Sequence, residues 1–417
     1  MKRFILAACL FAAPVGAATV DMQPPARGDV AGVALVVADA KGVVRVTARG
    51  LAVADPARAR PMGADTPVRV ASVSKLVVAI GVMRLVEAGK LDLDSDVSRW
   101  LGWPLRNPAF PDAPVTLRQL LSHTSGVVDG PGYSFPLEAS LRGSLTAAHW
   151  SGSVPGGRFA YANLNYGIIG TVMEAATGER FDRLMSAQVL APLRLDAGYN
   201  WSGASDAAVA AAGVLYRSGK DESDWHPDGD FVAQIDDIQG VRPDCPVRSE
   251  AGCDLADYVP GSNGTMFSPQ GGLRISALGL AKIGRMLLGQ GRVDGVRLLT
   301  PASVRMLMTP VWRASGRPQD DTYQGQMLCY GAGLQCLSGQ PGASDQMVPG
   351  APQAWWGHLG EAYGLLGGLW VDKSKQRVLV YLMTGTRADP FAAPHRSAFS
   401  AIEEQLLIEL AATPARR

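Results

Sequence analysis

Two pairs of strand-like segments at opposite ends of the chain constrain the fold most strongly. Near the start, residues 32–40 and 43–50 are apolar and β-branched, and Lys41-Gly42 separates them, which is the pattern of a β-hairpin. Near the end, residues 364–371 and 377–384 flank a short polar segment in the same way. The segments between these pairs read mostly as helices. We therefore predict an α/β (α+β) fold, in which an antiparallel sheet built from both termini is flanked by helices and carries an inserted, mainly helical lobe.

The intervening segments space their apolar residues at helical intervals. The longest pattern starts at Ser74, and Gly89 supplies its stop signal. Thr116 precedes a short helical pattern, as a capping residue does. The predicted helices cover residues 74–89, 117–122, 163–178, 181–190, 276–289, 301–309 and 398–412.

We expect residues 19–417 to form a single domain. Apolar residues make up 47% of the chain and charged residues 18%, which is the balance of a globular protein. The α/β lobe is expected to comprise about residues 19–89 and 273–417, and the helical lobe about residues 90–272. Residues 202–272 are rich in Gly, Asp, Ser and Pro and predict a long irregular insertion, and long ordered loops are more often functional than idle.

The first 18 residues have the layout of a secretory signal peptide. Lys2 and Arg3 precede an apolar run that ends at the small residues Ala17-Ala18. This run is too short to remain as a stable membrane span. Cys9 ends a short motif that resembles a lipoprotein cleavage box, but only five residues precede that motif and apolar residues continue beyond it. We expect a periplasmic or secreted protein and no lipid anchor at Cys9.

The charge balance narrows the range of partners. The formal net charge is +1, and removal of Lys2 and Arg3 with the signal would bring the mature chain near −1. Nucleic acids and acidic membranes are bound by clustered basic surfaces, which this balance does not suggest. We therefore expect a small-molecule or peptide-like substrate and no nucleic acid. The sequence leaves the oligomeric state unknown.

Four cysteines remain without Cys9, and an even number in an oxidising compartment usually means disulfides. Short loops would pair Cys245 with Cys253 and Cys329 with Cys336. The second pair encloses a strand-like segment whose extended length of roughly 23 Å exceeds the ~4–7 Å that a disulfide tolerates between Cα atoms. Either this segment bends sharply or the pairing differs, so the connectivity stays open. No Cys or His cluster has metal-ligand spacing, and we expect no metal or other cofactor.

Ser72 and Lys75 form the first candidate catalytic pair. Of eight lysines, only Lys75 has a serine three residues before it, at the start of the long predicted helix. At that spacing the amine lies one turn from the hydroxyl on the same face. A lysine whose pKa is lowered can activate a serine, and the helix N-terminus favours a developing oxyanion. Taken alone, the pattern also fits a capping serine and a solvated lysine.

Two further elements carry chemistry-bearing residues. Tyr161-Ala-Asn163 is the only Tyr-x-Asn among ten tyrosines and follows a Pro-Gly-Gly turn. A phenolate beside an ammonium can take the serine proton and deliver it to a leaving group, and the amide offers a donor and an acceptor. His358 lies near Gly357 and Gly360, which would let a substrate approach the backbone of an edge strand. Taken singly, these residues also fit ordinary packing.

Together the three elements resemble the serine β-lactamase and penicillin-binding protein family, in which Ser-x-x-Lys, Tyr-x-Asn and a cationic residue-x-Gly follow in this order. The likeness is greatest to the branch that holds class C β-lactamases, DD-peptidases with His-Thr-Gly, D-aminopeptidases and β-lactamase-like esterases. It covers about residues 30–412. Family-like blocks are VASVSKL at 70–76, LLSHTSG at 120–126, PGGRFAYANLNYG at 155–167, GGLRIS at 271–276 and GHLGEAYG at 357–364.

The resemblance implies catalytic roles for three residues. Ser72 would be the acylated nucleophile, and Lys75 and Tyr161 would share proton transfer. His123 lies in a family-like block, and we interpret it as structural.

The resemblance also implies a substrate-binding set. Asn163 would contact the acyl side chain or hold Lys75, while His358 with the adjoining Gly360 would line the far wall. The oxyanion hole would consist of the backbone N–H groups of Ser72 and Glu361.

Two departures from class C β-lactamases bear on the substrate. His358 replaces a lysine, and Leu359 replaces a threonine. The weaker positive charge and the lost hydroxyl should weaken binding of a β-lactam carboxylate, and Glu361 adds a negative charge nearby. These changes favour esterase or peptidase-like activity.

The predicted function is an exported serine hydrolase that forms an acyl-serine intermediate on ester, amide or D-amino-acid-containing substrates. A β-lactamase or D-Ala-D-Ala carboxypeptidase is the alternative. A non-catalytic penicillin-binding or sensor module is a further one, against which the complete set of motif residues argues. No Gly-x-Ser-x-Gly, Walker-type or His-Glu-x-x-His pattern is present. The loops at 202–272 and 312–356 would set specificity, so the physiological substrate is not predicted.

Overall fold

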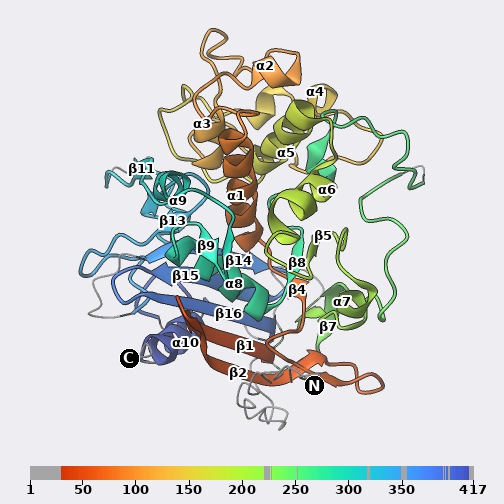
Figure 1. Cartoon of the computed structure of the whole chain (residues 1–417), viewed down its shortest axis with the longest axis vertical. Helices are drawn as coiled ribbons and strands as arrows, with labels where there is room; N and C mark the ends of the chain where they lie inside the picture. The colour runs from red at the N-terminus through yellow and green to blue at the C-terminus, as the bar shows by residue number, and fades with distance from the viewer. Residues whose placement is uncertain are drawn as a thin grey trace, which may run out of the picture.

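The computed structural model describes most of the chain beyond the expected signal segment (Figure 1). The predicted signal peptide at residues 1–18 and Cys9 lie outside the described residues. The described residues are 30–219, 226, 228–250, 252–316, 320–348, 355–387, 389, 391–392 and 395–412.

A large antiparallel sheet draws its central strands from both ends of the chain (Figure 1). β1 (Val30–Asp39) pairs with β2 (Gly42–Val53), its hairpin partner, and with β16 (Arg377–Thr386) from the other end. β16 continues to β15 (Leu365–Asp372), and β15 to β14 (Trp355–Ala362). Both predicted hairpins and the predicted fold class are confirmed.

The sheet also takes strands from segments that the sequence did not assign to it. β6 (Leu215–Arg217) pairs in parallel with the end of β16 and antiparallel with β7 (Val232–Ile235). The insertion at 202–272 is therefore not wholly irregular. The order of the long sheet is β11-β12-β13-β14-β15-β16-β1-β2-β3. Its remaining strands are β3 (Arg60–Pro61), β11 (Trp312–Arg313), β12 (Cys329–Tyr330) and β13 (Gln335–Cys336).

Helices cover both faces of the central strands. α8 (Ala277–Leu288) packs on one face and α10 (Ala401–Ala412) on the other. On β1, Val36 faces the first side and its neighbour Leu35 the second. Because the strands are buried on both sides, their sequences read as nearly continuous apolar runs rather than as alternating patterns.

The middle of the chain forms short helices around α1 (Val73–Glu87), which Figure 1 shows running from the sheet into this part. The predicted helices lie within one to three residues of those observed, except that the pattern at 181–190 divides into α6 and a π-helical turn, η2. The other helices are α2 (Ser98–Leu101), α3 (Leu117–Leu121), α4 (Leu141–Ser144), η1 (Ala147–His149), α5 (Leu164–Thr177), α6 (Phe181–Met185), η2 (Ser186–Leu190), α7 (Asp206–Ala210), η3 (Gly264–Phe267) and α9 (Pro301–Leu307). Within the described residues, every helix is too short or too polar to cross a membrane.

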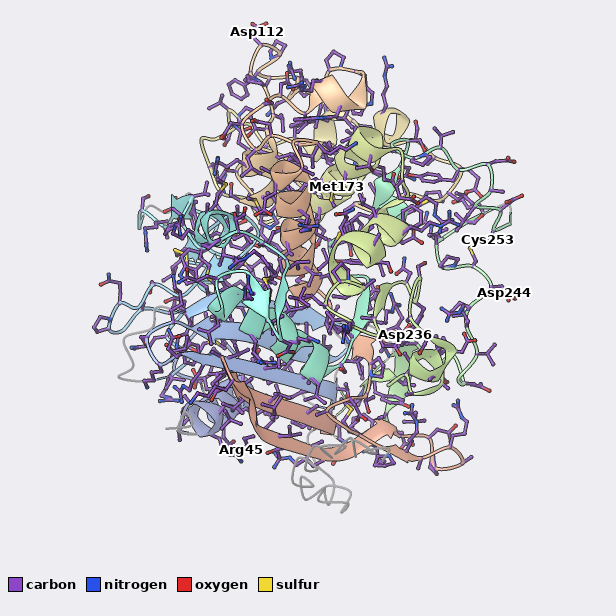
Figure 2. All side chains as sticks on the ribbon, viewed as in Figure 1. Arg45, Asp112, Met173, Asp236, Asp244 and Cys253 are labelled. Carbon is purple, nitrogen blue, oxygen red and sulfur yellow. A yellow bond between two sulfur atoms is a disulfide. The ribbon has the colours of Figure 1, made fainter. Side chains whose placement is uncertain are left out.

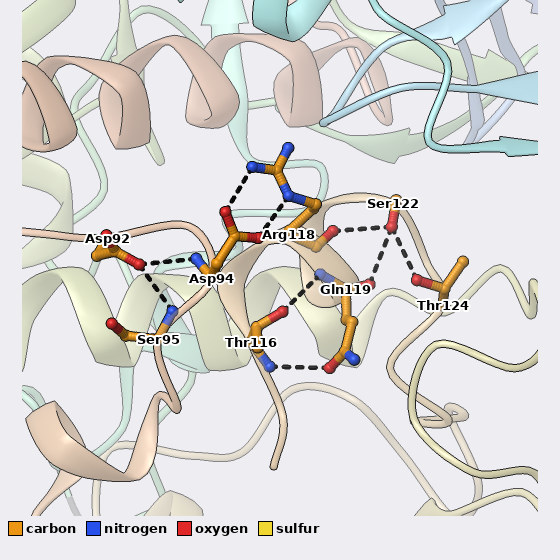
Figure 3. Close-up of polar contacts among 8 residues, drawn as sticks. All are labelled: Asp92, Asp94, Ser95, Thr116, Arg118, Gln119, Ser122 and Thr124. Carbon is orange, nitrogen blue, oxygen red and sulfur yellow. Dashed lines mark hydrogen bonds and ion pairs between the residues drawn. The ribbon is translucent and has the colours of Figure 1, made fainter.

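The start of α3 confirms the predicted cap (Figure 3). The Thr116 hydroxyl accepts a hydrogen bond from the Gln119 backbone, and the Gln119 side chain accepts one from the Thr116 backbone. Such a reciprocal cap satisfies two helix-end donors, and its loss typically costs about 1 kcal/mol. Just beyond the helix, Ser122 and Thr124 flank His123 in the sequence, and their hydroxyl oxygens lie 2.9 Å apart. The cap thus holds the segment that carries His123.

Both short-loop disulfides form. Cys245 and Cys253 have Cα atoms 5.4 Å apart, and those of Cys329 and Cys336 are 5.0 Å apart. The second pair closes because β12 and β13 form a sharp hairpin instead of one extended strand. Gly333 at the turn has φ 87°, and a Cβ there would meet the Cβ of Ala79 on α1 at 2.3 Å. This glycine therefore permits the bend that the sequence left open.

A small three-stranded sheet contains the strand that precedes α1. β4 (Val68–Arg69) pairs with β8 (Leu273–Ile275), and β8 pairs with β5 (Gly198–Tyr199). A separate two-stranded hairpin, β9 (Arg292–Val293) and β10 (Val296–Arg297), lies beyond α8.

Candidate active site

Ser72 stands at the turn between β4 and α1. The preceding Ala71 has φ 44°, a left-handed conformation that turns the chain from the strand into the helix. Ser72 is the N-cap residue of α1, but its side chain makes no capping hydrogen bond. In the described part of the chain its N–H also has no acceptor, while the next three N–H groups bond back to the turn. In the described part of the chain, the N–H of Ser72 is therefore free for other chemistry, and its hydroxyl is not used as a cap.

Lys75 lies fully buried beside this hydroxyl. Its Nζ is 2.8 Å from Ser72 Oγ, 2.8 Å from Asn163 Oδ1 and 3.1 Å from the carbonyl oxygen of Gln270. Burial lowers the pKa of Lys75 to about 7, although the negative charge of Asp129 acts in the opposite direction. Near neutral pH a substantial fraction of this amine is thus uncharged.

The neutral amine has a defined orientation at this position. Carbonyl oxygens only accept hydrogen bonds, so its two N–H groups point to Asn163 Oδ1 and to the Gln270 carbonyl. The lone pair then faces the Ser72 hydroxyl. This arrangement is the one that a base needs in order to take the hydroxyl proton.

Asp129 determines which atom of Asn163 faces Lys75. The Asn163 Nδ2 group donates to Asp129 Oδ2 at 3.0 Å, and Leu164 N at the start of α5 donates to Asp129 Oδ1 at 2.9 Å. A carboxylate only accepts, so the amide must present Nδ2 to Asp129 and Oδ1 to Lys75. Asp129 therefore anchors both the helix start and the amide.

The phenol ring of Tyr161 packs beside the Lys75 amine. The lysine Nζ is 4.9 Å from the centre of the phenol ring. The Tyr161 hydroxyl is buried and has no hydrogen-bond partner of ordinary geometry among the described residues. Burial raises the pKa of Tyr161 well above 10, although the nearby Ser72 hydroxyl acts to lower it. The phenol is consequently protonated at neutral pH.

Two neighbours hold the Tyr161 segment. Asp321 Oδ2 accepts from the Tyr161 backbone N–H at 3.0 Å. The His123 ring packs 4.4 Å from the Tyr161 ring, and its Nδ1 accepts from the N–H of Ala162. This placement agrees with the interpretation of His123 as structural.

His358 faces the same cluster from β14 but is fully buried. Its Nδ1 is 2.6 Å from the carbonyl oxygen of Leu359, so Nδ1 carries the proton, and Nε2 accepts from the Tyr330 hydroxyl at 2.7 Å. Burial and the charge of Lys75 lower the pKa of His358 to about 3. The imidazole is thus neutral at physiological pH. Its predicted role in substrate binding stays a prediction.

The end of β14 lies directly against the turn that carries Ser72. A Cβ at Gly360 would meet the carbonyl oxygen of Val70 at 2.5 Å, so only glycine allows this approach. Glu361 follows as an exposed residue. Among the described residues, β13 pairs with β14 at Trp356 and Gly357. Within the described residues, β14 is therefore an interior strand at its start and an edge strand near Ser72.

Comparisons with known proteins identify the family. A sequence profile described as Beta-lactamase matches residues 18–401. The chain belongs to the beta-lactamase family. Esterase EstB from Burkholderia gladioli is 38% identical over 173 residues, covering 36% of this chain and 43% of the esterase. The D-alanyl-D-alanine-carboxypeptidase/endopeptidase AmpH from Escherichia coli K12 is 28% identical over 137 residues, covering 31% of this chain and 35% of AmpH.

The chain thus spans less than half the length of these two curated relatives. A solved penicillin-binding protein homolog from Caulobacter crescentus superposes with a TM-score of 0.62 at 22% identity, covering 93% of both chains. This likeness extends the beta-lactamase-family fold over nearly the whole chain.

In this family member, the structure brings the sequence-predicted residues together. Ser72, Lys75 and Asn163 are in direct contact, and Tyr161 and Gly360 adjoin them. Sequence reasoning missed Asp129, Gln270, Tyr330 and Asp321, because they come from loops and a short strand without a motif of their own. In the described part of the chain, no group of three or more His, Cys, Asp or Glu side chains is arranged to hold a metal.

Asp129→Asn is expected to lower kcat/KM for an ester by about 10- to 100-fold, because the Asn163 amide loses its charged anchor. It should also move the acid limb of the pH–rate profile to lower pH, because the charge of Asp129 raises the pKa of Lys75. Ester hydrolysis measured from pH 5 to 9 reports both effects. The matched control is Asp112→Asn, an exposed carboxylate at the far end of the molecule (Figure 2). An unshifted acid limb in Asp129→Asn would contradict this coupling.

Proposed function

We propose that this beta-lactamase-family protein is a serine hydrolase that forms an acyl-serine intermediate on ester substrates. The observation that carries the proposal is the environment of Lys75. Two carbonyl oxygens accept from its N–H groups, and its Nζ lies 2.8 Å from Ser72 Oγ, where the lone pair of the neutral amine would face the hydroxyl. A pKa of about 7 makes the amine a usable base at physiological pH.

The proposed acylation step begins when Ser72 Oγ attacks the ester carbonyl and its proton passes to Lys75 Nζ. The N–H of Ser72, which has no acceptor in the described part of the chain, and the N–H of Glu361 would hold the oxyanion. The tetrahedral adduct then expels the alcohol, which takes a proton from Tyr161. Tyr161 regains its proton from the Lys75 ammonium. Because the pKa of Tyr161 is raised, its phenol is protonated at neutral pH. This state suits a proton donor to the leaving alcohol better than a base that takes the Ser72 proton.

Deacylation would use the same groups in reverse. Lys75 accepts a proton from a water molecule as its oxygen attacks the acyl carbon, the tetrahedral adduct breaks the bond to Ser72 Oγ, and the Lys75 ammonium returns the proton to that oxygen. Asn163 and Asp129 would keep Lys75 oriented through both steps.

Ester substrates are supported by the neutral state of His358. A family member that binds a β-lactam carboxylate at this position needs a cation, and a buried imidazole with a pKa of about 3 does not supply one. The similarity to an esterase over 173 residues points the same way, and the similarity to a D-Ala-D-Ala carboxypeptidase keeps the peptidase as the second candidate.

We also infer export to the periplasm or the cell exterior. The first 18 residues have a signal-like layout, and the structure contains two disulfides, which persist in oxidising compartments. The disulfide hairpin at Cys329–Cys336 carries Tyr330, which bonds to His358, so oxidation would also order the site.

Intact-protein mass spectrometry with a fluorophosphonate tests the reaction class. We expect one adduct on the purified protein, mapping to Ser72, together with turnover of 4-nitrophenyl butyrate and negligible turnover of a chromogenic cephalosporin. Absence of any adduct would overturn the serine-hydrolase proposal. A long-lived penicilloyl adduct without ester turnover would favour the peptidase or sensor alternative.

A further inference from the structure

A cavity of about 480 Å³ adjoins the candidate active site. Part of its wall is the segment 245–248 of the insertion, which the Cys245–Cys253 disulfide ties down. Figure 2 shows Cys253 on the outlying loop of this insertion. The polar lining residues that matter here are Arg69, Arg248, Ser268, Gln270, Arg274 and Tyr363. Among the described residues that line the cavity, none is acidic.

The three arginines that line the cavity differ in their ion-pair partners. Arg274 forms a buried two-point ion pair with Asp236, which Figure 2 places beside the small sheet, and a further bond to Asn200. Arg248 is largely exposed and lies 3.6 Å from Glu250. Arg69 has no acidic partner within ion-pair distance among the described residues. Its guanidinium donates to Ser268 Oγ at 3.2 Å, lies 4.9 Å from the centre of the Tyr363 ring, and keeps a buried Nε without an acceptor.

Arg69 is half-buried, and its Nε is buried without an acceptor in the described part of the chain, which is costly unless a partner compensates it. Burial and the charge of Arg274 lower the pKa of Arg69 to about 10, so the guanidinium still carries its charge at neutral pH. The planar fork with unused donors matches a carboxylate, which can accept two parallel hydrogen bonds. The cavity therefore has the charge, the space and the donors for a carboxylate.

The cavity is close to Ser72, on the side away from the rings that surround Tyr161. Arg69 precedes Ser72 by three residues, which limits the separation of their Cα atoms to roughly 10 Å. Gln270 lines the cavity, and its carbonyl contacts Lys75. The groups that surround Tyr161 are not part of the cavity lining. Because the leaving group would sit at Tyr161, its proton donor, the cavity is placed to receive the acyl part.

We propose that Arg69 and this cavity form an acyl-side subsite for a carboxylate, so that the preferred substrates are esters whose acyl chain ends in an anionic group. The inference rests on the proposed serine-hydrolase function. It also gives the insertion a role, because the segment that the disulfide holds lines part of the subsite.

Paired esters test the selectivity. The substrates are mono-4-nitrophenyl esters of succinic, glutaric, adipic and suberic acids, beside 4-nitrophenyl butyrate as the neutral reference. A third arm, 4-carboxyphenyl butyrate, carries its anion on the leaving group. We expect at least one dicarboxylic monoester to exceed butyrate in kcat/KM, with an optimum chain length, and no such gain for 4-carboxyphenyl butyrate.

Arg69→Met keeps the apolar stem of the side chain and removes its charge. We expect the ratio of kcat/KM for the best monoester to that for butyrate to fall by about 30-fold, since a charged hydrogen-bonded contact is lost. Arg69→Lys should recover part of this ratio. The matched control is Arg305→Gln, an exposed arginine on α9, which should leave the ratio as it is. A ratio that Arg69→Met does not change, or a gain only for 4-carboxyphenyl butyrate, would overturn the proposal.

Direct binding separates this proposal from the proposed reaction. Calorimetry with monomethyl glutarate and with neutral methyl butyrate is performed on Ser72→Ala and on Ser72→Ala combined with Arg69→Met. Tighter binding of the glutarate that Arg69→Met removes supports the subsite even if no ester is turned over. Equal binding of the two probes would reject the subsite even if butyrate is hydrolysed.

Discussion

Ser72→Ala is expected to reduce hydrolysis of 4-nitrophenyl butyrate by at least about 10³-fold, because it removes the atom that would form the acyl bond. Thermal unfolding should change by less than about 2 °C. The Ser72 side chain caps no helix, and within the described residues its hydroxyl bonds to Lys75, so the folded state loses little. Initial rates and a thermal melt on the same preparation measure both.

Ser74→Ala is the matched control for this change. Ser74 is fully buried two residues away, and its hydroxyl accepts from Leu273 N at 3.1 Å, which joins α1 to β8. Its loss should lower the free energy of unfolding by about 1–2 kcal/mol while fluorophosphonate labelling still occurs at Ser72. Ester hydrolysis that survives Ser72→Ala would show that another residue is the nucleophile.

Lys75 is expected to set the acid limb of activity. Below pH 7, kcat/KM should fall about tenfold per pH unit, because protonation of a group with a pKa of about 7 removes the base. Above pH 7 the profile should level off. Lys75→Met should lower kcat/KM by about 10³-fold or more, since Ser72 then has no base within hydrogen-bond distance in the described part of the chain. A pH series with 4-nitrophenyl butyrate measures the limb.

The same group makes a prediction for stability. The pKa of Lys75 in the folded state lies below its value in the unfolded state. The resulting contribution to the free energy of unfolding is fully present above about pH 10.5 and declines as the pH falls towards 7, because the unfolded chain then binds the proton more tightly. When the pH falls from 10 to 7, the free energy of unfolding of Lys75→Met should therefore rise relative to that of the wild type, by on the order of 4 kcal/mol. The control is Lys282→Met, whose amine lies at the surface 3.5 Å from Asp294. An acid limb near pH 5 or an unchanged stability difference would contradict the lowered pKa.

The helices and hairpins could be predicted because their determinants are local. The hairpin at Lys41-Gly42, the cap at Thr116 and the stop at Gly89 depend on residues within one turn of each other. The short strands β6 and β12 could not be predicted, since two or three residues carry no periodicity and form only by pairing with a distant strand. Likewise, the bend at Gly333 depends on its contact with Ala79 on α1.

By itself, the sequence determined the class of fold, the serine–lysine pair and the motif residues around it. These follow from spacing along single elements, as when three residues place Lys75 beside Ser72 on one helix. Only the tertiary structure decided the properties of these groups. The lowered pKa of Lys75, the orientation of Asn163 by Asp129 and the neutral state of His358 all arise from burial and from contacts between segments far apart in the chain. Desolvation and hydrogen bonding depend on what surrounds a group in space, and the chain brings those surroundings together only when it folds.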